Sequence, residues 1–217
     1  MTARTVEWPR AGACLAAGVL CLFGFAAGAG AADPDNPDWP CIQRKVPEIS
    51  VAVVWAGPDV DEADRRWRDG GDLESLVRTL VARRVPLEDA TARIDSYAAD
   101  LGPDKDATLT LLFTGLWQTI NAERSEIMNG IERYDRRQKA LAATIKQHFS
   151  ERDGLLGQDS SDATAQQKLH DLEERLAWET RIFDEREKSL KFVCESPVLL
   201  EQRLFALARQ IMGHLDE

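Results

Sequence analysis

Two long stretches of this sequence repeat apolar residues at alternating steps of three and four, and they constrain the fold more than any other feature. The first stretch runs from residue 107 to 151 and the second from 162 to 193. Such sustained spacing keeps one face of each helix against a partner helix. Gly154 and Gly157 lie between the stretches, among Asp, Gln and Ser residues that end one helix and cap the next. The sequence therefore predicts an antiparallel αα-hairpin over residues 107–193.

The apolar repeat of each helix is interrupted by polar residues. The apolar positions are Phe113, Trp117, Ile120, Ile127, Ile131, Tyr134, Leu141 and Ile145 on the first helix, and Leu169, Leu172, Leu176, Phe183, Leu190 and Val193 on the second. Arg124 and Gln138 interrupt the first seam, and Glu179 and Arg186 interrupt the second. A single polar pair at a seam can fix the alignment of two helices at some cost in stability. We therefore expect these four polar residues to set the register of the hairpin.

Two antiparallel registers, one heptad apart, keep both seams in contact. In one register the turn is centred near residue 155, and Arg124 faces Arg186, which sets like charges against each other. In the other the turn is centred between residues 158 and 159, so that Gln138 faces Glu179 and Arg124 faces Val193. The second register gives Glu179 a hydrogen-bond donor and separates the arginines. We predict the second register.

The segments on either side of the hairpin predict a small helical head. Short helices are expected between residues 59 and 102, and a final helix from Pro197 to His214 has enough apolar residues to pack against them. Residues 109–113 are apolar nearly all round, so the first third of the long helix should be buried in this head. Beyond Asn121 the helix is apolar on one stripe only, as a projecting stalk would be. The expected fold is all-α, with one helical domain over residues 59–217.

Residues 1–31 have the composition of a secretory signal peptide. Arg4 and Arg10 precede an apolar run over residues 11–27, and residues 29–31 supply the small side chains that signal peptidase requires. A retained membrane anchor is the alternative, because the run is close to spanning length. No other stretch is apolar and long enough to cross a bilayer. We expect a soluble periplasmic or secreted protein with no membrane insertion after signal cleavage.

The cysteines support the same compartment. Cys14 and Cys21 would leave with the signal peptide, so that only Cys41 and Cys194 remain. Two cysteines in an oxidising compartment most simply pair with each other. Neither belongs to a CxxC motif, which argues against a thioredoxin-like redox site. The predicted disulfide would fasten the N-terminal segment to the far end of the second long helix, and two unpaired buried thiols are the alternative.

Residues 32–58 predict an extended N-terminal arm. Asp-Pro, Asn-Pro and Trp-Pro steps keep the chain extended as far as Pro40, since the residue before a proline avoids the α region. We expect the arm to lie across the helices, with apolar anchors at Trp39, Val46, Ile49 and Trp55. Trp55, Trp67 and Trp117 have a second interpretation, as the lining of a small-molecule pocket in the head. Core packing is the commoner role of a buried tryptophan.

The sequence contains no catalytic motif. No serine lies in a nucleophile elbow, and the Gly70-Gly71 pair is flanked by aspartates that would repel phosphate. His148 and His170 could approach each other across the hairpin, but two histidines without a fixed spacing do not predict a metal site. We therefore expect no enzyme activity, no cofactor and no metal. The formal net charge of −10 argues against nucleic acid or anionic lipid as a partner, because both are bound largely through Lys and Arg.

One part of the arm resembles a known group of proteins. The run Asp38-Trp39-Pro40-Cys41, with residues 43–48 after it, is similar to an uncharacterised family of exported bacterial proteins. The resemblance covers the arm and part of the long helix, and it implies no activity. We expect a non-catalytic accessory or protein-interaction factor that uses its helical hairpin to contact another envelope protein. The alternative is a periplasmic small-molecule-binding protein with the tryptophan-lined pocket.

Overall fold

The computed structural model describes residues 36–61, 64–69, 71–157 and 162–216, all of which belong to one compact unit, Ala32–Glu217. The elements in chain order are α1 (Val51–Val54), the 3₁₀ helix η1 (Arg66–Arg68), α2 (Asp72–Val81), α3 (Leu87–Ala99), α4 (Lys105–Leu156) and α5 (Ala163–Met212). The described residues contain no strand, and the predicted all-α fold is confirmed. The predicted signal peptide lies outside the described residues.

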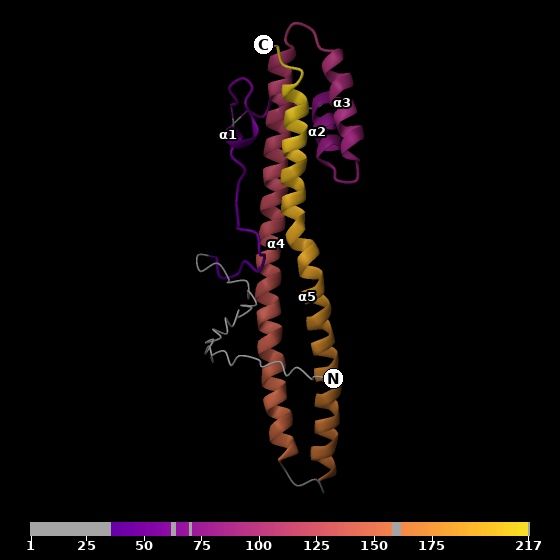
Figure 1. Ribbon diagram of the computed structural model, residues 1–217. Coiled ribbons are helices and arrows are strands. Elements are labelled where there is room, and N and C mark those ends of the chain that lie inside the picture. The colour runs from indigo at the N-terminus through magenta and orange to yellow at the C-terminus, as the bar shows by residue number, and fades with distance from the viewer. Residues whose placement is uncertain (1–35, 62–63, 70, 158–161, 217) are drawn as a thin grey trace, which may run out of the picture. The chain divides into compact units, whose positions relative to one another are not determined.

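The two long helices, α4 and α5, lie side by side and run in opposite directions (Figure 1). They are 52 and 50 residues long, and both extend beyond their predicted ends, α4 past residue 151 and α5 past residue 193. The side chain of Asp162 caps α5 by accepting a hydrogen bond from the Thr164 amide at 2.8 Å. Asp satisfies an otherwise unpaired amide at this position, which explains why α5 begins there.

The prediction of a break before Pro197 was wrong, because α5 continues through this residue to Met212. A proline inside a helix removes one backbone hydrogen bond and clashes with the preceding turn, at a cost of roughly 3 kcal/mol. Pro197 is buried, and apolar residues beyond it on α5 have no exposed surface, among them Leu200, Leu204 and Leu207. Burial of this apolar face offsets the cost of the proline. The helix bends between its orange and yellow parts in Figure 1.

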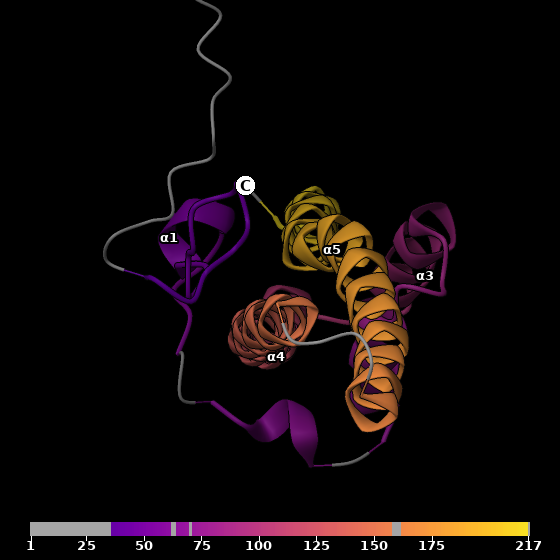
Figure 2. The ribbon, with the colours of Figure 1, turned by 90° about the horizontal axis from the view of Figure 1, so that it is seen from below.

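Most of the apolar core lies where the first part of α4 and the last part of α5 meet α1, η1, α2 and α3. We call this region the head, residues 49–120 and 200–216, and the remainder of the hairpin the stalk, residues 121–157 and 162–199. Trp55 stacks on Phe113 in the head core, with ring centroids 4.1 Å apart. Figure 2 shows α1 and α3 on opposite sides of the α4–α5 pair. The predicted burial of the first third of the long helix is confirmed, since Leu109, Leu112 and Phe113 are fully buried.

The turn between α2 and α3 is fastened to α5 by one arginine. Arg203 donates from Nε to the Leu80 carbonyl at 2.6 Å and from Nη1 to the Val85 carbonyl at 3.0 Å. The carbonyls of the last helical turn lack partners within their own helix. Arg203 therefore caps the end of α2 and seats the α2–α3 turn on α5.

The arm differs from the predicted extended segment in two ways. Residues 51–54 form the short helix α1, and the side chain of Val46 is 45% exposed, so that it does not anchor the arm. The other expected anchors, Trp39, Ile49 and Trp55, are buried. Val46 points outward because its backbone carbonyl, not its side chain, is held by α4, through a hydrogen bond from Arg124 at 3.2 Å.

Candidate functional site

The three tryptophans proposed to line a pocket do not converge on one recess. Trp117 borders a recess of about 520 Å³, Trp67 borders another of about 330 Å³, and Trp55 borders neither. Each indole N–H donates to a protein oxygen: Trp55 to the Pro58 carbonyl, Trp67 to the Gln118 side chain and Trp117 to the Ile49 carbonyl. The three residues are at least 93% buried. These side chains act in packing the head and in holding the arm.

The predicted pairing of Cys41 with Cys194 is confirmed. Their sulfur atoms lie 1.99 Å apart and their Cα atoms 5.6 Å apart, which joins the arm to the stalk part of α5. Trp39 lies beside this disulfide in a small cluster with Met128 and Ile131 of α4. This cluster is separate from the head core, so the arm supplies the buried aromatic residue at this level of the stalk.

The arm runs antiparallel to α4 and is held along it by polar contacts. Asp38 accepts a hydrogen bond from Arg136 at 2.9 Å, and Lys45 pairs with Glu132 further along. The amide side chain of Asn121 then holds Ile49 in both directions, accepting from its N–H at 2.9 Å and donating to its carbonyl at 3.1 Å. The arm is therefore fixed at several points between residues 37 and 49, and the Arg136 guanidinium holds the pKa of Asp38 below its usual value.

Arg124, predicted to interrupt the seam, joins three segments. Its side chain is 3% exposed, and it donates to the Pro197 carbonyl of α5 at 3.3 Å and to the Val46 carbonyl of the arm at 3.2 Å. Glu201 lies 3.5 Å away, which makes a weak ion pair. Burial lowers the pKa of the Arg124 guanidinium, and the charge of Glu201 opposes this change. Arg124 is thus the polar junction of α4, α5 and the arm.

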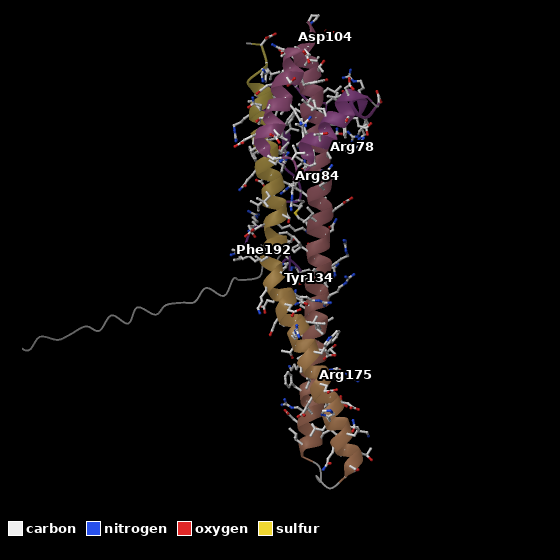
Figure 3. All side chains as sticks on the ribbon, turned by 90° about the vertical axis from the view of Figure 1, so that its right-hand side faces the viewer. Arg78, Arg84, Asp104, Tyr134, Arg175 and Phe192 are labelled. Carbon is white, nitrogen blue, oxygen red and sulfur yellow. A yellow bond between two sulfur atoms is a disulfide. The ribbon has the colours of Figure 1, made fainter. Side chains whose placement is uncertain are left out.

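The register of the hairpin matches neither predicted alignment. Gln138 donates to the Phe183 carbonyl at 3.2 Å, one helical turn beyond its predicted partner Glu179. Tyr134, labelled in Figure 3, donates to the Arg186 carbonyl at 2.6 Å. Because α4 continues to Leu156 and α5 begins only at Ala163, the chain reverses later than predicted. Backbone carbonyls of α5, and not its charged side chains, accept these hydrogen bonds.

Glu179 pairs with a histidine instead of Gln138. His148 Nδ1 lies 2.7 Å from Glu179 Oε2, and both side chains are mostly buried between the two helices. His170 is not part of this contact and lies 3.6 Å from Glu174 on its own helix. The described residues contain no group of three or more His, Cys, Asp or Glu side chains that could hold a metal ion. The contact is a polar bridge across the stalk.

Sequence reasoning missed an exposed apolar face on α5. Trp178 is 65% exposed, Phe192 70% and Leu199 49%, on the side of the helix opposite to the buried residues Leu172, Leu176 and Cys194. Figure 3 shows Phe192 on the α5 side of the stalk, away from α4. We call this face the outer seam; its residues are Trp178, Ile182, Glu185, Ser189, Phe192, Ser196 and Leu199. The alternating steps of four and three between these positions were the signal that could have revealed it.

Within the described ranges, no helix is both long enough and apolar enough to cross a membrane. Comparison of the chain with protein-family models, with curated proteins and with solved structures gave no match. The resemblance of the arm to exported bacterial proteins is therefore still an expectation. The function has to be argued from the geometry of this chain alone.

Proposed function

We propose that this protein is a non-catalytic accessory factor of the cell envelope that binds another protein through its helical hairpin. The observation that carries the proposal is the outer seam, where Trp178 and Phe192 are exposed on a helix whose opposite face is already buried. Large apolar side chains that are exposed along one face of a helix mark surfaces that bind other proteins. The opposite face needs no further partner, because it packs on α4.

Export is part of the proposal. A disulfide between Cys41 and Cys194 persists in an oxidising compartment, and the composition of residues 1–31 supports secretion. The stalk also has the rigidity that a protein-binding surface needs, because the arm, Arg124 and the disulfide hold it at several levels. A rigid surface loses less conformational entropy when it binds.

The small-molecule alternative has less support. The three tryptophans border separate recesses or none, and their N–H groups already donate to protein oxygens. A ligand site needs polar groups that are still free to orient the ligand. We therefore place the protein-binding role first.

A photo-crosslinking amino acid placed at single surface positions tests the proposed function. The positions are Phe192 on the outer seam, Val53 on α1 and Ile42 in the arm, all of them exposed. After export in the native cell, we expect Phe192 to cross-link one envelope protein in a stoichiometric amount. Val53 and Ile42 lie outside the hairpin and should give no defined product. If Phe192 gives no defined product, the proposed function is wrong.

A further inference from the structure

The outer seam continues into a part of α5 that is already occupied by other helices of this chain. Extending its steps from Leu199 by four, three and four residues leads to Arg203, Ala206 and Gln210. Arg203 donates to carbonyls at the end of α2 and in the α2–α3 turn, and Gln210 pairs with Asp95 of α3. In the head, therefore, this face of α5 is covered by α2 and α3. In the stalk, no described element covers it, and Trp178 and Phe192 are exposed there.

The outer seam is long enough to bind one further helix, and a groove beside it could receive side chains of that helix. From residue 178 to 199 it spans about 32 Å at the rise of an α-helix, which is three heptads. A groove of about 580 Å³ lies along one side of it, between Phe149 of α4 and α5; Leu176 and Ala177 give it an apolar part, and charged residues, among them Arg181 and Lys188, line the rest. Side chains of a docked helix would enter this groove, as knobs enter holes in a coiled coil.

A second copy of this chain is a poor occupant, because like charges would meet. A two-fold antiparallel pairing that sets Trp178 against Phe192 brings Glu185 against the same residue of the other copy. It also sets Arg181 against Lys188. In an antiparallel pair, residues that face each other have a nearly constant sum of residue numbers, and this pair has nearly the same sum as Trp178 and Phe192. On the same flank, Glu174 would approach Glu195. Repulsion at all of these contacts disfavours self-association.

The charges beside the outer seam specify a different partner. One flank carries Glu174, Arg181, Lys188 and Glu195 at intervals of seven residues. A complementary helix would present basic, acidic, acidic and basic residues to them in turn, as flanking residues do in coiled coils. The upper end of the seam opens into a recess of about 650 Å³, whose charged residues are Arg78, Arg83, Arg84 and Glu123, so that cations outnumber the one carboxylate. Figure 3 labels Arg84 at this end of the stalk. Cations favour the C-terminal end of a helix.

From this geometry we propose that the outer seam binds one amphipathic helix of another envelope protein, parallel to α5, with its C-terminal end under the α2–α3 turn. This inference rests on the proposed function and names the surface and the chemistry of the partner. In the head, α2 and α3 cover this face of α5, and the docked helix would cover the same face along the stalk. Trp178 and Phe192 are the apolar anchors, and the four flanking charges give the specificity.

Two synthetic peptides test the proposal against the oxidised full chain. Both have the same composition and an apolar seam of three heptads. One carries flanking charges in the order basic, acidic, acidic, basic, and in the other each sign is exchanged to give acidic, basic, basic, acidic. Fluorescence anisotropy of the labelled peptides measures binding. We expect the complementary peptide to bind at least about tenfold more tightly at low salt, and this preference to shrink at high salt.

Matched variants locate the binding surface. Trp178→Glu combined with Phe192→Glu should weaken binding of the complementary peptide by about 30-fold or more, as the loss of two aromatic anchors does. Val53→Glu, at an equally exposed residue on α1, should leave binding unchanged. All of these positions are exposed, so the variants should fold, which circular dichroism checks.

Several results would overturn this inference. They are equal affinity for the two peptides, no binding of either, or binding that the double variant does not affect. A dimer that the double variant disperses in sedimentation equilibrium would replace the proposed partner with a second copy of the chain. A defined cross-link from Phe192 together with equal affinity for the two peptides would reject the proposed partner helix while leaving the proposed function standing.

Discussion

The head and the stalk contain the same two helices, but they are held together differently. In the head, α4 and α5 share a core with four other elements, and residues such as Leu112 and Leu207 are fully buried. In the stalk the two helices have only each other and the arm, and Gln138, Tyr134 and His148 make polar contacts across the seam. The comparison indicates that the head supplies stability, whereas the stalk supplies an exposed helical surface that a few specific contacts hold in place.

The largest expected change in the free energy of unfolding comes from removing the disulfide, which fastens the stalk to the arm. Cys41 and Cys194 are 153 residues apart in the sequence. Because a cross-link over such a long loop reduces the entropy of the unfolded chain, replacing both residues by serine should lower the free energy of unfolding by about 4 to 5 kcal/mol. Urea denaturation of the oxidised protein and of the double variant measures the difference. A loss below about 1 kcal/mol would mean that the arm holds the stalk without the disulfide.

Two leucines of α5 compare the regions directly. Leu207 in the head has no exposed surface, whereas Leu199 in the stalk is 49% exposed. Leu207→Ala should cost about 3 kcal/mol, because it leaves a cavity in the core, and Leu199→Ala should cost less than about 0.5 kcal/mol. Denaturant unfolding gives both values. Equal costs would show that the outer seam is covered in the folded protein.

Two glycines of α4 should respond in opposite directions. A Cβ at Gly115 in the head would lie 2.8 Å from a Val77 methyl and 2.9 Å from the Trp67 ring, whereas at Gly130 in the stalk the nearest atom is 3.8 Å away. Gly115→Ala should therefore destabilise by about 1 to 2 kcal/mol through overpacking. Gly130→Ala should stabilise by about 0.5 to 1 kcal/mol, because alanine favours the helix. Thermal unfolding of the two variants should give shifts of opposite sign.

The smallest effect concerns the ion pairs of the arm. The pKa of Asp38 is lowered by its hydrogen bond from Arg136 and by the charge of Lys139. The stabilisation from this carboxylate is thus present above the unfolded-state pKa of about 4 and is lost as the pH falls through the lower folded-state value. Hydrogen exchange of residues 36–41 should be faster in Asp38→Asn than in the parent at pH 7, and the two should converge at strongly acidic pH. A difference that persists there would mean that the carboxylate acts through another contact.

The sequence by itself determined the features that depend on local patterns. Apolar steps of three and four predicted the two long helices, and their burial against each other followed from the same steps. The glycines and polar residues around residue 157 predicted the reversal of the chain. Cysteine counting predicted the pair Cys41–Cys194, because the expected removal of residues 1–31 would leave no other cysteine. The burial of Trp55 followed from its expected role as an anchor of the arm on the helices.

Other features were decided only by the tertiary structure, because packing there overrides the preference of the local sequence. Pro197 predicts a helix end, yet burial of the apolar face beyond it carries α5 through the bend. The register was decided by backbone carbonyls of α5 that accept from Tyr134 and Gln138, and a sequence pattern that pairs side chains with side chains cannot anticipate these contacts. In the sequence, the residues of the outer seam do not differ from those of an ordinary exposed helix face. It became distinct only because α2 and α3 cover the upper part of that face and leave the lower part exposed, which is a matter of how the helices pack.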